Sequence, residues 1–72
     1  MLKSIDTNTI GYRIRLARIG VNLTQRKLAE MVHIGPSYLA TVERGSKNAS
    51  EDLIRRIAAV THTTSDWILG IS

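Results

Sequence analysis

Apolar residues recur along the chain at intervals of three and four positions, the spacing that places side chains on one face of an α-helix. Leu28 and Val32 are four residues apart, and Leu39 and Val42 are three apart. The sustained alternation of apolar and polar residues that marks a half-buried strand is missing from the sequence. The pattern therefore predicts an all-α protein with a core of aliphatic side chains.

Capping residues and helix breakers divide this pattern into five short helices. A Ser or Thr hydroxyl accepts N–H groups at a helix start, and glycine takes the left-handed conformation after a helix end. Thr24, Ser50 and Thr64 are the expected caps, and Gly45 and Gly70 the expected stops. The expected helices cover about 9–19, 25–32, 36–44, a stretch after Ser50, and 65–69. The short connections predict a single domain over 1–72, with a core of about 9–70.

Residues 25–45 carry the most specific pattern, two helices joined by a bend at Gly35-Pro36. Proline suits a first helical position because its missing N–H would have no partner there. Ala29 is small where the two helices would come closest. The outer face of the second helix then carries Ser37, Tyr38, Thr41 and Arg44. Such short, polar or cationic residues suit a surface that lies in a DNA groove, so the segment predicts a DNA-reading helix-turn-helix.

Charge and composition agree with a nucleic-acid partner. Ten Lys and Arg outnumber six Asp and Glu, which gives a net charge of +4 and a pI near 10.1. A small basic domain favours a polyanionic partner. The absence of Cys excludes a disulfide framework and fits a reducing cytosol, so we expect a cytoplasmic protein. No apolar run approaches the roughly 20 residues of a membrane span, and residues 6–9 are polar, so neither a membrane segment nor a secretory signal is expected.

The two histidines occupy corresponding places, since His33 and His62 each follow the last residues of an expected helix. Backbone φ is often positive there, and His tolerates that conformation better than most residues other than glycine. With no Cys and no second His at helical spacing, the pair does not make a metal site. The chain also offers no acid, base or nucleophile pair. We therefore expect no metal, no cofactor, no small-molecule ligand and no enzymatic activity.

Taken together, these residues resemble the Cro and lambda-repressor type helix-turn-helix family over about 10–70. The resemblance rests on short segments in a fixed order and spacing: Ile10-Gly11 with Ile14 and Arg18, Leu23-Thr24-Gln25, Leu28-Ala29, Glu43-Arg44-Gly45, Ile57-Ala58 and Asp66-Trp67-Ile68-Leu69-Gly70. It implies a compact five-helix lambda-repressor-like domain whose third helix lies in the major groove. It also implies a homodimer on a palindromic double-stranded DNA operator.

The resemblance further implies which residues touch DNA. Base edges are assigned to Pro36, Ser37 and Thr41, with Tyr38 beside them. Tyr38 has three alternative roles: stacking on a sugar, touching a phosphate, or packing on Ile34. Several relatives place Gln at the position of Pro36 to contact adenine, so in this chain the base code must rest on other residues.

Contacts to the phosphate backbone are implied for a second set of residues. Gln25 begins the second helix, where relatives hydrogen-bond a phosphate. The full set is Thr24, Gln25, Arg44, Ser46, Lys47 and Asn48. Arg18 and Glu43 match a pair that relatives join as an internal salt bridge, and we expect the same pair here.

Several other residues have a plain structural interpretation. Arg26, Lys27, Arg55 and Arg56 are expected on solvated faces, with a dimer surface as the alternative for the last two. Trp67 is expected in the core, with a ligand site or the edge of the dimer interface as alternatives.

The most direct functional interpretation is a sequence-specific transcriptional repressor of a phage, mobile element or bacterium, which occludes an operator as a two-fold dimer. The alternative is a protein-interaction module, such as an antitoxin-like partner, built on the same fold. That module would carry an apolar outer face on the third helix. Ser37, Thr41 and Arg44 argue against it, while Pro36, Tyr38 and Ala40 leave some room for it.

Overall fold

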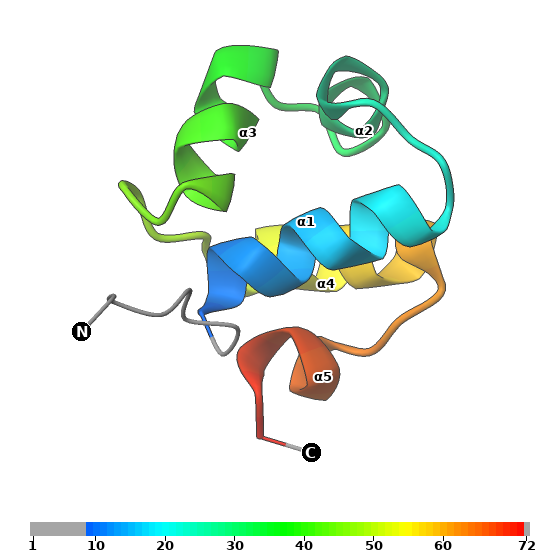
Figure 1. The fold of residues 1–72 in the computed structure, drawn as a ribbon, viewed down its shortest axis with the longest axis vertical. Helices are drawn as coiled ribbons and strands as arrows, with labels where there is room; N and C mark the ends of the chain where they lie inside the picture. The colour runs from blue at the N-terminus through cyan, green and yellow to red at the C-terminus, as the bar shows by residue number, and fades with distance from the viewer. Residues whose placement is uncertain (1–8, 72) are drawn as a thin grey trace, which may run out of the picture.

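The computed structural model describes residues 9–71, and within that range it is all-α, as expected. The helices are α1 (Ile10–Gly20), α2 (Gln25–Met31), α3 (Pro36–Glu43), α4 (Glu51–Thr61) and α5 (Ser65–Leu69). In Figure 1, α1 crosses the middle of the molecule with α4 behind it. The pair α2 and α3 lies on one side of these helices, and α5 lies on the other. Because α1 packs against α3, α4 and α5, it is the central element of the fold.

Each helix contributes a completely buried aliphatic side chain to one shared core: Ile14, Leu28, Leu39, Ile57 and Ile68. The spacings of three and four residues also predicted which helix faces point inward. Val32 and Val42, the partners of Leu28 and Leu39 in those spacings, are buried as well. Leu39 and Val42 face inward on α3, which leaves its opposite face toward solvent.

The expected caps are confirmed, and they set the helix starts. The hydroxyls of Thr24, Ser50 and Thr64 accept hydrogen bonds from the backbone N–H three residues later, at 3.0–3.1 Å. Thr9 does the same for the N–H of Tyr12 at 3.2 Å and has extended backbone angles. The first helix therefore begins one residue later than expected, because Thr9 is its cap and not its first turn. The expected second and third helices each ran one residue too long, since Val32 and Arg44 are C-caps.

Trp67 packs against the core, as expected. Arg13 on α1, which the sequence did not single out, lies over its indole ring. The Arg13 guanidinium lies 5.1 Å from the centre of the indole ring, within cation–π range. Its Nη1 also donates to the Trp67 carbonyl oxygen at 2.9 Å. Arg13 thus ties α1 to α5.

Two absences hold for the part of the chain that the structure describes. None of the helices in residues 9–71 has the length and apolarity needed to cross a membrane. In the same range, no three His, Cys, Asp or Glu side chains gather as candidate metal ligands.

Both histidines have the left-handed conformation that the sequence predicted, with φ of 64° at His33 and 60° at His62. Glycine accepts positive φ without strain but adds entropy to the unfolded chain. His33→Gly and His62→Gly should therefore leave the free energy of unfolding unchanged or raise it by less than about 1 kcal/mol. Val at either position should lower it, because a β-branched residue fits this region poorly. Urea unfolding of the four variants measures the effect, and a clear loss of stability in both Gly variants would contradict the capping role.

Candidate nucleic-acid interface

The outer face of α3 presents polar side chains to solvent. Pro36 is the first residue of the helix, and Gly35 before it is an N-cap without a side chain. Pro36, Ser37 and Tyr38 are exposed, as expected, whereas Thr41 one turn later is half-buried. The residues assigned to base edges therefore lie within the first two turns of α3.

Internal hydrogen bonds restrict what two of these side chains can offer a ligand. The Thr41 hydroxyl donates to the Tyr38 carbonyl oxygen at 2.6 Å, which leaves its lone pairs and its methyl group for other contacts. The Tyr38 hydroxyl donates to the Asn48 carbonyl oxygen at 3.3 Å, a contact that none of its three expected roles included. While that bond holds, Tyr38 has no hydroxyl proton for a phosphate.

The loop after α3 holds four of the residues assigned to the phosphate backbone: Arg44, Ser46, Lys47 and Asn48. All four are exposed. Gly45 has a φ of 86°, and its N–H donates to the Val42 carbonyl oxygen at 3.0 Å. The Ser46 N–H donates to the Thr41 carbonyl oxygen at 3.0 Å. Backbone hydrogen bonds to the end of α3 thus fix the start of the loop at Gly45 and Ser46. The Tyr38 hydroxyl fixes the loop again at Asn48.

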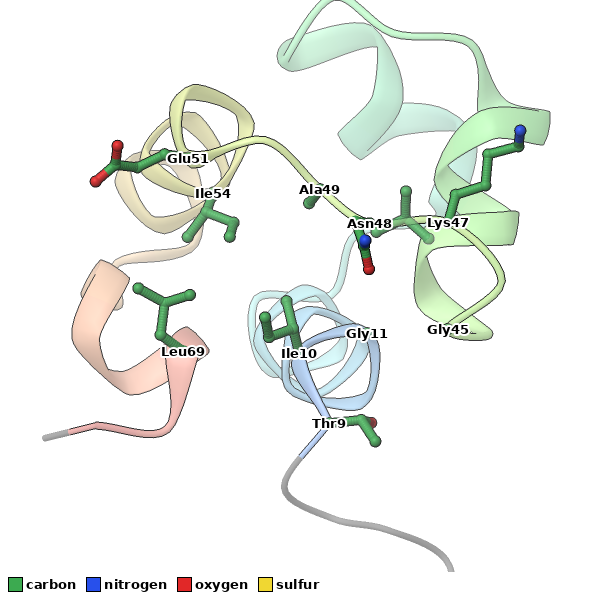
Figure 2. Close-up of a pocket in the computed structure, with 11 residues that line it drawn as sticks. Thr9, Ile10, Gly11, Gly45, Lys47, Asn48, Ala49, Glu51, Ile54 and Leu69 are labelled. Atoms are coloured by element: carbon green, nitrogen blue, oxygen red, sulfur yellow. The ribbon is translucent and has the colours of Figure 1, made fainter.

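A cavity of about 770 Å³ lies behind this loop. Figure 2 shows Ile10, Ile54 and Leu69 facing a common space, with the loop from Gly45 to Ala49 along one side. The Lys47 side chain extends away from that space. The loop therefore borders this pocket, while Ala49 at its end packs against the hydrophobic core.

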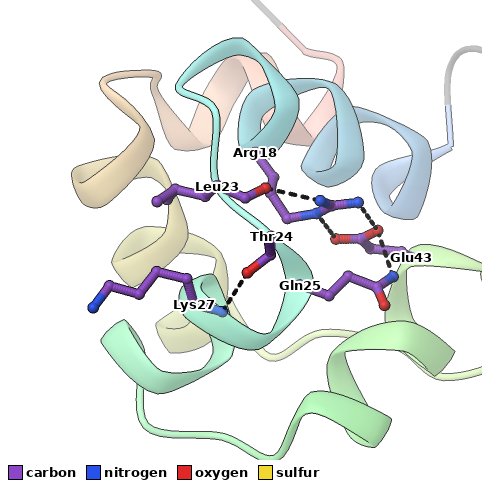
Figure 3. A network of polar contacts seen from close by, with 6 residues as sticks. All are labelled: Arg18, Leu23, Thr24, Gln25, Lys27 and Glu43. Carbon is purple, nitrogen blue, oxygen red and sulfur yellow. Dashed lines mark hydrogen bonds and ion pairs between the residues drawn. The ribbon is translucent and has the colours of Figure 1, made fainter.

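Arg18 and Glu43 form the expected salt bridge, shown in Figure 3. The Arg18 Nε donates to Glu43 Oε2 at 2.8 Å, and its Nη2 donates to Oε1 at 3.1 Å, so the pair is bidentate. The two side chains are only 12 % and 3 % exposed. The Arg18 Nη1 also donates to the Leu23 carbonyl oxygen at 2.9 Å. One guanidinium therefore joins α1, the segment before α2, and the end of α3.

Gln25, expected at a phosphate, has a protein partner as well. Its Nε2 donates to Glu43 Oε1 at 3.0 Å, so the salt bridge orients the amide (Figure 3). An amide nitrogen carries two protons, and the second remains for another acceptor. The Thr24 hydroxyl accepts from the Lys27 N–H at 3.0 Å and keeps its own proton. Both side chains at the start of α2 thus retain a donor.

The basic residues expected on solvated faces divide into two groups. Lys27 and Arg55 are about 60 % exposed and pair loosely with Glu30 and Glu51 on their own helices. The expectation for Arg56 was wrong, because its Nη1 donates to the Val32 carbonyl oxygen at 2.6 Å. Asp52 and Arg56 lie four residues apart on α4 and form an ion pair at 3.0 Å, but nothing in the sequence indicates the bond across to the end of α2.

Gly11 belongs to the segment that carried the resemblance, yet the sequence assigned it no role. A Cβ at this position would lie 2.3 Å from the Val42 carbonyl oxygen and 2.7 Å from that of Glu43. The start of α1 can therefore contact the backbone of α3 only through glycine. This contact sets how closely α3 approaches the central helix.

Comparison with protein families and relatives adds evidence independent of this geometry. A family model described as "Helix-turn-helix" matches residues 14–68. An immunity repressor protein of Bacillus phage phi105 is 36 % identical over 62 residues, which cover 86 % of this chain and 43 % of the relative. The HTH-type transcriptional regulator ImmR of Bacillus subtilis (strain 168) is 27 % identical over 62 residues, which cover 86 % of this chain and 49 % of the relative. The chain thus spans less than half the length of both relatives.

Solved structures of regulators share the fold. The clp gene regulator ClgR from Corynebacterium glutamicum superposes with a TM-score of 0.82 at 26 % identity, covering 97 % of this chain and 74 % of that one. The restriction-modification controller protein C.AhdI from Aeromonas hydrophila gives a TM-score of 0.78 at 30 % identity, covering 88 % of this chain and 96 % of that one. Both matches confirm the expected five-helix arrangement.

Proposed function

The chain belongs to the helix-turn-helix family, and on that premise we propose that it binds a specific double-stranded DNA sequence and represses transcription by covering an operator. One observation carries the proposal. The α3 helix exposes Ser37 and Tyr38, and donors lie close by at the start of α2, where Gln25 bonds to Glu43 at the end of α3, and in the exposed loop at 44–48. The relatives are an immunity repressor and a transcriptional regulator, which supports regulation and not catalysis. Since the relatives come from a bacterium and a bacterial phage, whose DNA lies in the cytoplasm, we propose the same location for this protein.

Affinity would come mainly from phosphate contacts, which carry no sequence information. Neither Arg44 nor Lys47 forms an ion pair with another described residue, so both positive charges remain available to an anion. The remaining donors of Thr24 and Gln25 would contact a phosphate from the start of α2.

Sequence choice would come from Ser37, Thr41 and the apolar surface of Pro36. Ser37 can donate or accept a hydrogen bond. Thr41 has its proton committed to the Tyr38 carbonyl oxygen, so it would accept from a base amino group or place its methyl against a thymine methyl. Tyr38 would act beside them by positioning the loop through Asn48.

We also propose that the protein binds as a two-fold homodimer on a palindromic operator. Ile71 follows α5 and is 70 % exposed, and we expect this end of the molecule to meet the second copy. Trp67 on α5 is only partly buried, which leaves part of it available for the alternative role at the edge of an interface.

Selection of bound duplexes from a random pool tests these proposals together. We expect one enriched motif with two-fold symmetry, bound by two protein copies. An enriched motif without symmetry would overturn the dimer but not the DNA-binding proposal. If no motif is enriched and the chain instead binds another protein, the interaction module is favoured.

Ser37→Ala and Thr41→Ala should each weaken binding to the selected duplex by about 1–3 kcal/mol. They should barely change binding to a scrambled duplex, because neither residue is assigned to the backbone. Titration of both duplexes by fluorescence anisotropy measures the difference. Equal losses on the two duplexes would contradict base reading.

Lys47→Ala and Arg44→Ala should weaken binding to every duplex alike. The slope of log K against log salt concentration should shrink by about 1 for each lost phosphate contact. Lys27→Ala is the control, since Lys27 pairs loosely with Glu30 on an exposed face. A lower affinity with an unchanged slope would instead indicate a structural role, for example at the α3 C-cap that Arg44 occupies.

A further inference from the structure

The bend between α2 and α3 begins at the Val32 carbonyl, which accepts no hydrogen bond from within α2. The helix α2 ends at Met31, and Val32 is its C-cap. The last carbonyls of a helix have no intrahelical partner. If the helix continued, the donor for the Val32 oxygen would be the N–H of residue 36, but Pro36 has none. The N–H groups of His33 and Ile34 point back to Glu30 and Ala29.

Arg56 supplies the missing donor from another helix. Its Nη1 lies 2.6 Å from the Val32 oxygen, and its Nη2 lies 3.0 Å from the Asp52 carboxylate one turn earlier on α4. The guanidinium is thus held at both ends, and its side chain is 39 % exposed. The last turn of α2 contains no basic residue, so this cation on α4 also provides the positive charge that a helix C-terminus favours.

We propose that Arg56 is a positioning residue for DNA recognition: by holding the Val32 carbonyl it sets the orientation of α3 relative to α2. This inference rests on the proposed function, in which Gln25 at the start of α2 and Ser37 on α3 contact one duplex at the same time. Both contacts form only if the angle between the two helices is held closely, and a small displacement forfeits one of them. Arg56 acts through the bend and does not itself touch DNA.

Arg55 provides a matched control. It is the neighbouring residue on α4, it pairs with Glu51 one turn earlier at 3.6 Å, and it is 60 % exposed. Arg55→Met and Arg56→Met each remove one positive charge and keep a long side chain. Only Arg56→Met removes a hydrogen bond to the bend.

The test compares binding to the duplex selected by the wild-type chain with binding to a scrambled duplex, at a temperature where circular dichroism shows every variant folded. Arg56→Met should lose about tenfold more affinity for the selected duplex than Arg55→Met does. Both variants should lose the same small factor on the scrambled duplex. Arg56→Lys keeps a donor and a charge and should recover part of the loss. Equal losses for Arg55→Met and Arg56→Met on the selected duplex would overturn the proposal.

A second measurement needs no DNA. Residual dipolar couplings of backbone amides report the angle between α2 and α3, which should change in Arg56→Met and stay as in wild type in Arg55→Met. If no duplex is ever enriched, the proposed function fails, yet this angle still decides whether Arg56 positions the bend. If Arg56→Met does not fold, Arg56→Ala, which also lacks a side-chain N–H donor and favours the helix, replaces it in both measurements, with Arg55→Ala as its control. An unchanged angle in the folded variant would overturn the proposal.

Discussion

Replacing Glu43 by Ala should lower the free energy of unfolding by about 3–5 kcal/mol, because it strands a nearly buried cation. The Glu43 carboxylate, 3 % exposed, accepts two hydrogen bonds from Arg18 and one from Gln25. Without it, the guanidinium, 12 % exposed, keeps only its bond to the Leu23 carbonyl oxygen. Urea unfolding followed by circular dichroism measures the loss.

Two controls separate a stranded charge from a general loss of packing. Replacing Arg18 by Met and Glu43 by Leu together should cost less than Glu43→Ala, since no buried charge remains unpaired. It should still cost something, because the Leu23 carbonyl loses its donor. Glu30→Ala breaks the exposed pair with Lys27 and should cost less than about 1 kcal/mol. A double-mutant cycle without coupling between Arg18 and Glu43 would contradict this account.

Gly11→Ala should lower the free energy of unfolding by about 3 kcal/mol, at the upper end of what overpacking costs. The added methyl would lie 2.3 Å from the Val42 carbonyl oxygen. That atom belongs to the backbone of α3 and cannot rotate away, so α3 must shift as a unit. We therefore also expect weaker binding to the selected duplex at temperatures where the variant remains folded.

Gly20→Ala is the matched control for this prediction. Gly20 is the last residue of the same helix, and nothing lies within 4 Å of a Cβ built there. Alanine is the better helix former, so this variant should gain up to about 1 kcal/mol. Thermal unfolding of the two variants should therefore shift in opposite directions. A Gly11→Ala protein as stable as wild type would show that α1 and α3 do not need this close approach.

Much of this protein follows from local chemistry that is visible in the sequence. A hydroxyl such as that of Thr24 caps a helix through an N–H three residues away, so the sequence alone places the helix start. The spacing of Leu39 and Val42 determines which face of α3 is buried, and therefore which residues remain exposed. The positive φ at His33 also follows from its place after a helix end. The Arg18–Glu43 bridge was predicted only through the family resemblance, because its partners lie 25 positions apart.

Only the tertiary structure decided what happens between helices. Arg56 looked like a solvated residue because its partner, the Val32 carbonyl, is a backbone group that every residue carries, so the sequence contains no mark of it. The same holds for Gly11, whose neighbours are carbonyl oxygens of α3, and for Tyr38, whose hydroxyl reaches the Asn48 carbonyl. Periodicity and capping act within a few residues of one helix. Contacts between helices depend on how the elements pack in three dimensions, and in this protein those contacts set the position of α3.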